Sequence, residues 1–210
     1  MGTLLIVRHG ETEWNAEGRI QGHTDIGLSE NGAQQARSLG QRLADRQIDV
    51  AYSSDLKRTS ETARLALGHR NVVLNETPRL REYHKGIFEG MTLTEIQTQF
   101  PDEYPKYLDK DLSYAPEGGE TTRDVSMRMA SIFQEIKAKH LDETVLEVSH
   151  GGALRAAMVS LLCMPLEGNW SFVFGNCGLT MVDTFADNAV LRLFNDTSHI
   201  NGTGHHGISG

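Results

Sequence analysis

The chain has 210 residues, of which 20 are Lys or Arg and 28 are Asp or Glu, so its formal net charge is −8. An acidic chain without a basic run is poorly suited to bind nucleic acid or an anionic membrane, and no segment has the roughly 18 apolar residues of a membrane span. The first residues lack the pattern of an export signal and the two cysteines lack CxxC spacing, so we expect reduced thiols in a cytoplasmic protein.

Strand and helix patterns alternate along most of the chain. In order, we expect a strand at 3–7, a helix capped by Ser29, a strand at 49–53, a helix capped by Ser54 that runs to about 67, and a strand at 72–74. Further on come a long helix over 125–136, a strand at 144–148, a helix at 153–163, and two strands at 179–185 and 190–194. This alternation predicts an α/β three-layer sandwich, in which a mostly parallel central sheet has helices on both faces.

The segment at about 76–120 differs from its surroundings. It holds four of the five prolines and only short helical patches, one of them at 92–100, where Thr92 and Glu95 have the spacing of a capping box. We expect one domain over 1–200 with this segment as a small inserted cap, then a flexible glycine-rich tail at 201–210. The last two strands offer an edge through which a homodimer could pair.

Two polar clusters follow predicted strands. Arg8-His9-Gly10 comes directly after the first strand, and Ser149-His150-Gly151 follows the strand at 144–148. In open α/β sheets, ligands bind beyond the carboxyl ends of the strands, so we expect both clusters at one edge of the sheet. The helix that begins after Gly151 would add backbone N–H donors, and Arg58 is a further candidate. The residues predict an anion site without deciding the reaction.

Six blocks of the chain carry a resemblance to known enzymes. The first is Leu5-Ile6-Val7-Arg8-His9-Gly10-Glu11-Thr12-Glu13-Trp14-Asn15, and the last is Val148-Ser149-His150-Gly151-Gly152. Between them lie 19–25 with 28–29, 53–59 with 62–63, 80–82 with 86 and 89–90, and 116–121. In family order, these blocks resemble the motifs of the histidine phosphatase superfamily, which includes the phosphoglycerate mutases. The pattern is closest to the broad-specificity phosphatase branch.

The resemblance implies a role for each matching residue. His9 would be the nucleophile that takes the phosphoryl group, and Glu82 would give a proton to the leaving oxygen. Arg8, Arg58 and His150 would surround the phosphate. The pocket would be completed by Asn15, Gln21, Gly22 and the backbone of Gly151.

The chemistry of a phosphate monoester asks for the same residue types. A dianion repels a nucleophile, so positive groups must hold it and spread its charge, and arginine does so through planar, bidentate donation. His9 must be neutral to attack, and the neighbouring Arg8 favours that form by like-charge repulsion. Glu82 must start protonated to act as the acid, and afterwards it can activate water. No step needs a metal or another cofactor.

Other phosphatase classes do not match. A cysteine phosphatase needs an arginine six positions after its cysteine, where Cys163 has Asn169 and Cys177 has Asp183. The nine histidines are scattered, so we expect no metal site.

The choice between phosphatase and mutase depends on the cap. A mutase must exclude water and hold a bisphosphate, yet residues 85–120 hold three lysines and no arginine. Eight acidic residues lie in the same stretch: Glu89, Glu95, Asp102, Glu103, Asp109, Asp111, Glu117 and Glu120. An acidic cap favours a monoester whose remainder is uncharged or apolar. We therefore predict metal-independent hydrolysis of small phosphate monoesters through phosphohistidine, with a mutase and a non-catalytic phospho-ligand binding module as alternatives.

Overall fold

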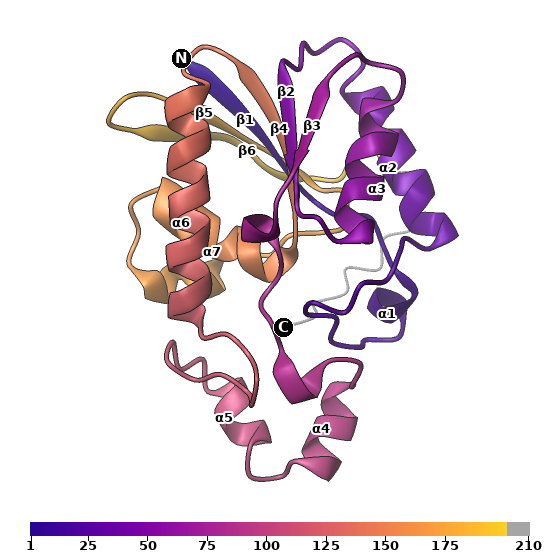
Figure 1. The fold of residues 1–210 in the computed structure, drawn as a ribbon, viewed down its shortest axis with the longest axis vertical. Coiled ribbons are helices and arrows are strands. Elements are labelled where there is room, and N and C mark those ends of the chain that lie inside the picture. Colours follow the sequence, from indigo (N-terminus) through magenta and orange to yellow (C-terminus); the bar gives the residue numbers. More distant parts are fainter. Residues whose placement is uncertain (201–210) are drawn as a thin grey trace.

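The computed structural model describes residues 1–200, so the predicted flexible tail at 201–210 lies outside the described residues. A six-stranded sheet in the order β3-β2-β4-β1-β5-β6 forms its centre (Figure 1). The strands are β1 (Gly2–Arg8), β2 (Val50–Ser53), β3 (Val73–Glu76), β4 (Thr144–Ser149), β5 (Leu179–Thr184) and β6 (Ala189–Asp196). Strands β1 to β4 pair in parallel, whereas β5 and β6 are antiparallel. The prediction of a mostly parallel sheet is confirmed.

Helices cover both faces of the sheet, which makes the three predicted layers. Helices α2 (Glu30–Arg42) and α3 (Lys57–Leu67) lie on one face, while α6 (Thr122–Lys139) and α7 (Gly151–Leu161) lie on the other (Figure 1). The remaining helices are α1 (Glu13–Ala16), α4 (Leu93–Gln99), α5 (Tyr104–Leu108) and the 3₁₀ turns η1 (Pro78–Leu80), η2 (Gly86–Phe88) and η3 (Leu166–Ser171). None of the helices within 1–200 is long and apolar enough to cross a membrane.

Helix caps follow the sequence patterns with one exception. Ser29 caps α2, and Thr92 caps α4 through a capping box with Glu95, as predicted. The prediction that Ser54 caps the next helix is wrong. Leu56 is the N-cap of α3, and Ser54 Oγ instead accepts a hydrogen bond from the Leu56 N–H at 3.3 Å.

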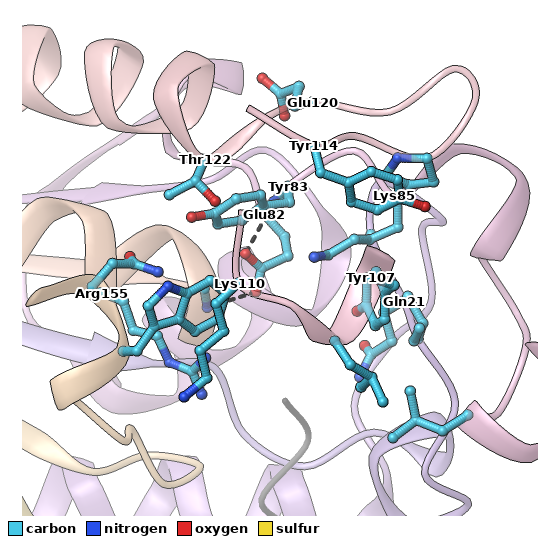
Figure 2. A pocket seen from close by; sticks show the side chains of 18 of the residues that line it. Gln21, Glu82, Tyr83, Lys85, Tyr107, Lys110, Tyr114, Glu120, Thr122 and Arg155 are labelled. Atoms are coloured by element: carbon cyan, nitrogen blue, oxygen red, sulfur yellow. Dashed lines mark hydrogen bonds between the residues drawn. The ribbon is translucent and has the colours of Figure 1, made fainter. Parts of the chain in front are cut away.

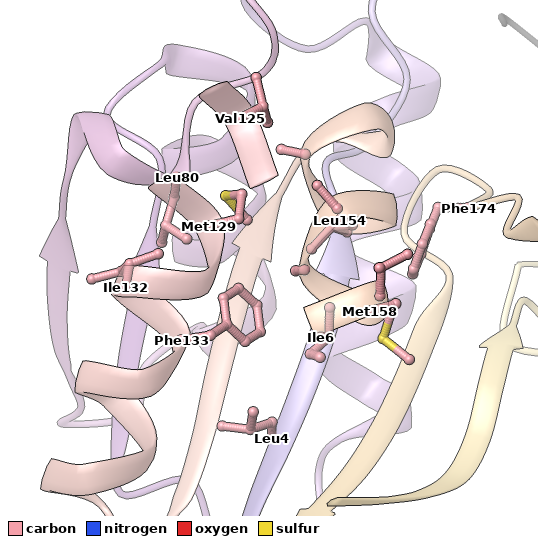
Figure 3. Close-up of a cluster of buried hydrophobic side chains, with 14 of the residues drawn as sticks. Leu4, Ile6, Leu80, Val125, Met129, Ile132, Phe133, Leu154, Met158 and Phe174 are labelled. Atoms are coloured by element: carbon pink, nitrogen blue, oxygen red, sulfur yellow. The ribbon is translucent and has the colours of Figure 1, made fainter. Parts of the chain in front are cut away.

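A hydrophobic core joins the sheet to α6 and α7. Figure 3 shows Phe133 of α6 and Met158 of α7 beside Ile6 of β1, and all three side chains are buried. The buried apolar residues of α6 have the helical spacing predicted for 125–136 and lie on the face toward the sheet: Val125, Met129, Ile132, Phe133 and Ile136. This packing fixes where α7 begins, at the carboxyl end of β4.

The register of β1 and β4 brings the two polar clusters together. Arg8 pairs with Ser149, and the His9 N–H donates to Ser149 O at 3.0 Å. Residues 77–120, with α4 and α5, lie beyond this end of the sheet, at the bottom of Figure 1. We propose that this segment is the cap of a single domain.

Candidate active site

A cavity of about 350 Å³ opens at the carboxyl ends of β1 and β4, facing the proposed cap. Its volume is at the small end of the roughly 300–1,000 Å³ usual for ligand pockets, which suits a small metabolite. Seven of the nine residues predicted for the site line it: Arg8, His9, Asn15, Gln21, Gly22, Arg58 and Glu82. His150 and Gly151 are not part of the lining, although Gly152 is.

A hydrogen bond of the His9 ring fixes which of its two nitrogens carries the proton. Its Nδ1 lies 2.7 Å from Gly10 O, and because a carbonyl only accepts, Nδ1 carries the proton. The neutral ring therefore keeps its lone pair on Nε2. Burial, then the charges of Arg58 and Arg8, hold the pKa of His9 well below its usual range. The predicted like-charge effect of Arg8 is present, but desolvation is the larger cause.

The rings of His150 and His9 meet edge to face, with their centroids 5.2 Å apart. Arg58 Nε donates to His150 Nδ1 at 3.2 Å, so the neutral His150 ring carries its proton on Nε2. Burial and the nearby Arg58 hold the pKa of His150 well below its usual range. The His150 Nε2 atom is buried without a hydrogen-bond partner among residues 1–200. It is therefore an N–H donor that a phosphoryl oxygen could satisfy.

Two arginines supply positive charge at the base of the cavity. Arg58 is fully buried, and its Nη2 and Nη1 donate to Gly22 O and Thr24 O at 2.7 and 2.8 Å. Burial lowers its pKa to about 10, so Arg58 stays charged at neutral pH. Arg8 donates from Nη1 to Phe174 O at 2.7 Å, while its buried Nε lacks a partner in the described part of the chain. Both guanidinium groups are fixed before any ligand arrives.

Glu82 is held by the first turn of α7. Its Oε2 accepts from the Gly152 N–H and its Oε1 from the Ala153 N–H, both at 2.9 Å. The N-terminal amides of α7 were expected to face a phosphate, but two of them donate to this carboxyl group instead. The Glu82 carbonyl is held as well, since His23 Nε2 donates to it at 2.8 Å and Arg128 Nη2 at 3.3 Å. Side chain and backbone of Glu82 are thus anchored from separate elements.

An asparagine that the sequence did not single out supports the nucleophile loop. Asn176 Nδ2 donates to His9 O at 2.9 Å and lies 3.4 Å from Asn15 Oδ1. Asn15 completes a capping box with Thr12 at the start of α1. Asn176 follows Gly175 in the short loop before β5, which also holds Gly178, and only that loop composition could have pointed to it.

The excess acid of the cap does not face the cavity, which corrects the expectation from its composition: of the eight acidic cap residues, only Asp111 and Glu120 line it. Lys85 and Lys110 line the cavity, together with Arg155 of α7. Several acidic residues of the cap are engaged elsewhere: Glu89 accepts from the His23 and Thr24 N–H groups, Glu95 from Arg19 and Thr92, and Glu103 from Lys106 and Tyr114. Composition alone did not show which charges would face the ligand.

Arg155, Asn169 and Trp170 also line the cavity and were missed from the sequence. Arg155 lies three residues after Gly152 on α7, hence on the same face of the helix, so helical periodicity could have found it. Asn169 and Trp170 lie on η3, which has no motif. Within residues 1–200, no group of three or more His, Cys, Asp or Glu is arranged to hold a metal ion.

Comparison with known proteins identifies the arrangement. A family model described as histidine phosphatase superfamily (branch 1) matches residues 4–197. The chain belongs to this superfamily. Phosphoserine phosphatase 1 of Hydrogenobacter thermophilus is 34% identical over 200 residues, which are 95% of each chain. Glucosyl-3-phosphoglycerate phosphatase of Mycolicibacterium vanbaalenii is 37% identical over 180 residues, 82% of this chain and 79% of that protein.

A solved structure confirms the fold. The structure named Bacillus stearothermophilus YhfR matches with a TM-score of 0.90 and 36% identity, and it covers 96% of this chain and 100% of that one. As a member of the superfamily with phosphatases among its relatives, the chain is an enzyme that hydrolyses phosphate monoesters.

Proposed function

We propose that His9 is the nucleophile and Glu82 the proton donor of a metal-independent phosphomonoesterase. The observation that carries this assignment is the hydrogen bond from His9 Nδ1 to Gly10 O, which leaves the Nε2 lone pair for the phosphorus atom. The depressed pKa of His9 keeps that lone pair available in the free enzyme. Glu82 lines the same cavity, where it can meet the ester oxygen.

The reaction has two balanced steps. In the first, the bond from His9 Nε2 to phosphorus forms, the ester P–O bond breaks, and the Glu82 proton moves to the leaving oxygen. In the second, the Glu82 carboxylate takes a proton from water, the water oxygen attacks phosphorus, and the N–P bond breaks. Inorganic phosphate leaves, and Glu82 is protonated again. A positioned acid or base of this kind contributes roughly 10²–10⁴-fold to a rate.

The phosphoryl group would be held by the remaining predicted residues. Arg8, Arg58 and the Nε2–H of His150 would donate to its oxygens and stabilise the charge of the transition state. Asn15, Gln21, Gly22 and the Gly151 backbone would complete the pocket. We expect no metal in any step.

A mutase is the second candidate, because Lys85, Lys110 and Arg155 supply the extra cations that a bisphosphate would need. Water access favours hydrolysis instead. Leu108 and Val173 in the cavity lining are 49% and 45% exposed, and Lys110 in the same lining is exposed too, so the mouth of the cavity is open to solvent. The third alternative, a binding module without turnover, requires that no ester be hydrolysed.

One assay tests these assignments. Wild type and His9→Ala are incubated with p-nitrophenyl phosphate, with and without EDTA. We expect hydrolysis by the wild type, unchanged by EDTA and lost in His9→Ala. Protein-bound phosphate that is acid-labile and base-stable, and absent from His9→Ala, would establish phosphohistidine, whereas acid-stable label would refute it. A coupled assay with 3-phosphoglycerate measures mutase activity.

The cellular context and breadth of the enzyme are part of the same proposal. Cys163 and Cys177 are free thiols, which suits the reducing cytoplasm. Strand β6 lies at an edge of the sheet, where a homodimer could pair, and the net charge of −8 disfavours nucleic acid. We expect the enzyme to accept a broad range of carbon skeletons, which kcat/KM values across a panel of monoesters would measure.

A further inference from the structure

Lys85 presents a positive charge to the cavity without an acidic partner. Its Nζ lies 4.6 Å from the centre of the Tyr83 ring and 5.2 Å from that of Tyr107, so the ammonium group is held between two aromatic faces. Over the described residues, no carboxylate forms an ion pair with Lys85. The aromatic faces position this charge without neutralising it, which leaves it available to an anion.

Arg155 is a second cation that lines the cavity without an ion-pair partner among the described residues. Its guanidinium carbon lies 5.9 Å from the Trp170 ring centre, and its buried Nε has no hydrogen-bond partner in the described range. The Nε1–H of Trp170 is also buried and unsatisfied there. A buried donor without an acceptor destabilises the folded chain. Two such donors beside one cavity indicate that a ligand supplies the missing acceptors.

The positive charge of Arg155 also affects the pKa of Arg8, one of the residues proposed to hold the phosphate. Burial lowers the pKa of Arg8, and the nearby Arg155 lowers it further, while Glu82 opposes both effects. Arg8 and Arg155 therefore lie close enough to repel each other. An anion bound beside them would relieve this repulsion.

The acidic residues that line the cavity are already engaged. Glu82 accepts from the amides of α7, and Glu120 pairs with Arg128 at 3.0 Å. Asp111 is exposed and accepts from the Ser113 N–H and hydroxyl. None of these carboxylates is left to neutralise Lys85 or Arg155.

The positions of Lys85 and Arg155 relative to Glu82 determine which part of a bound substrate these two cations would contact. Figure 2 shows Arg155 on one side of Glu82 and Lys85 on the other, with the Lys85 side chain directed toward the middle of the cavity. The leaving oxygen must lie beside Glu82, so the group attached to that oxygen would extend into the part of the cavity that Lys85 and Arg155 line. These cations meet the remainder of the substrate near its ester bond.

We propose that Lys85 and Arg155 form a second anion subsite, which selects phosphate monoesters carrying another anionic group, a carboxylate or a second phosphate, close to the ester oxygen. This inference rests on the proposed function of the same cavity. It replaces the expectation of an uncharged remainder, because Lys85 and Arg155 line the cavity without an ion-pair partner among the described residues. Exposed Lys110, with its Nζ 5.8 Å from the Trp170 ring centre, contributes less because solvent screens it.

Matched esters test the subsite. The ratio of kcat/KM for 3-phosphoglycerate over glycerol 3-phosphate isolates a carboxylate, and the ratio for fructose 1,6-bisphosphate over fructose 6-phosphate isolates a second phosphate. A hydrogen bond to a charged group changes a binding constant by roughly tenfold to a hundredfold. We expect at least one ratio to be about tenfold or more in the wild type, and the larger ratio identifies the preferred anion.

Lys85→Gln and Arg155→Gln should each reduce that ratio about tenfold, mainly through KM for the anionic ester. Lys110→Gln should change it less than about threefold. Lys106→Gln removes a cap lysine that pairs with Glu103 and does not line the cavity, so it should leave the ratio unchanged.

Because each ratio is measured within one enzyme, a loss of folded protein lowers both esters together and does not change it. Ratios near one in the wild type, or ratios that persist in both Lys85→Gln and Arg155→Gln, would overturn the subsite. If the wild type hydrolyses none of these esters and no p-nitrophenyl phosphate, the proposed function itself fails.

Discussion

The Gly152 N–H donates to Glu82 Oε2 at 2.9 Å, and this contact places the carboxyl group of the proposed acid at the N-terminus of α7. The first amides of a helix are favourable partners for a carboxyl group, and the two here fix the orientation of the Glu82 side chain. The same approach leaves no room for a side chain at position 152. A β-carbon there would lie 2.5 Å from Glu82 Oε1 and 2.9 Å from Tyr83 Cδ2.

Gly152→Ala should therefore displace Glu82 and lower kcat for p-nitrophenyl phosphate by about 10²-fold, the lower end of what a positioned acid contributes. The fold should persist, because alanine favours a helix more than glycine does. Gly151→Ala is the milder change and should lower kcat less, because a β-carbon at 151 would lie 3.4 Å from its nearest atom, Arg8 Nε. Equal kcat values for wild type and Gly152→Ala, with normal thermal unfolding, would contradict the position assigned to Glu82.

The acid limb of the pH–rate profile should reveal the environment of His9. Protonation of Nε2 removes the nucleophile as pH falls, and a depressed pKa moves that loss to lower pH. We expect kcat/KM, corrected for ionisation of the substrate, to change less than about threefold between pH 7 and pH 6. Arg58→Met removes one cause of the depressed pKa, so the limb should move to higher pH.

Lys57→Met is the matched control for that profile, because Lys57 is an exposed cation on the same helix that pairs with Asp25 at the surface. It should leave the acid limb where the wild type has it. A wild-type limb near pH 6.5 would show that burial and the two arginines do not keep His9 neutral.

Parts of this site were predictable because they depend on strand ends. The apolar runs that precede Arg8 and Ser149 locate two strands, and parallel strands end at one edge of a sheet. The hydrogen bonds from the first amides of α7 to Glu82 were not predictable in this way. Glu82 reaches them from the loop after η1, and the course of that loop depends on tertiary contacts such as those of Arg128.

The charge of the cavity shows the other limit of sequence reasoning. Composition correctly describes the cap segment as acidic, but it does not show which side chains face the cavity. Lys85 is directed inward by Tyr83 and Tyr107, whereas Glu89 is turned toward the His23 backbone. These orientations arise from packing between segments distant in the chain, which no local pattern records.

Arg128 should be important for stability as well as for the position of Glu82. Its Nη1 donates to Arg79 O at 3.0 Å and Arg81 O at 2.8 Å, and its Nη2 donates to Glu82 O at 3.3 Å. Arg128→Met removes the side-chain donor from the Arg79 and Arg81 carbonyls and leaves the Glu82 carbonyl with His23 alone, so we expect a loss of roughly 2–4 kcal/mol in the free energy of unfolding. Arg123→Met, at an exposed position on the same helix, should change it by less than about 0.5 kcal/mol in urea titrations.

Arg128→Met should also lower kcat, since the Glu82 backbone loses one of its two side-chain donors. His23 still donates to the same carbonyl, so the loss should be smaller than in Gly152→Ala. Unfolding free energies of Arg128→Met and Arg123→Met that agree within error would show that the loop before Glu82 is held by other contacts.

Ionisation of Glu147 makes the stability of the fold depend on pH. This dependence has the opposite sign to the one caused by the buried histidines. It lies in β4 beside Ile6 of β1, is fully buried, and neither carboxyl oxygen has a hydrogen-bond partner within residues 1–200. Strand alternation places Glu147 on the same face as Val145, toward the core under α6 and α7. Burial alone raises the pKa of Glu147 well above its usual range.

The folded chain therefore keeps a proton on Glu147 at pH values where the unfolded chain has released it. Each pH unit over which folding requires this proton uptake costs about 1.4 kcal/mol, so stability falls as pH rises from about 4.5 toward the folded pKa. Glu147→Gln removes the ionisation at similar size. Its gain in melting temperature should be larger at pH 7.5 than at pH 4.5, while Glu167→Gln, an exposed control, should show no such difference.

Comparing Glu147→Gln with the wild type isolates the effect of Glu147, because His9 and His150 contribute equally to the pH dependence of both proteins. The depressed pKa values of His9 and His150 make the unfolded chain bind protons first, so their contribution to stability is lost as pH falls below about 6.5. Subtracting wild type from Glu147→Gln at each pH cancels that effect. A difference that is constant between pH 4.5 and 7.5 would mean that Glu147 ionises alike in the folded and unfolded chains.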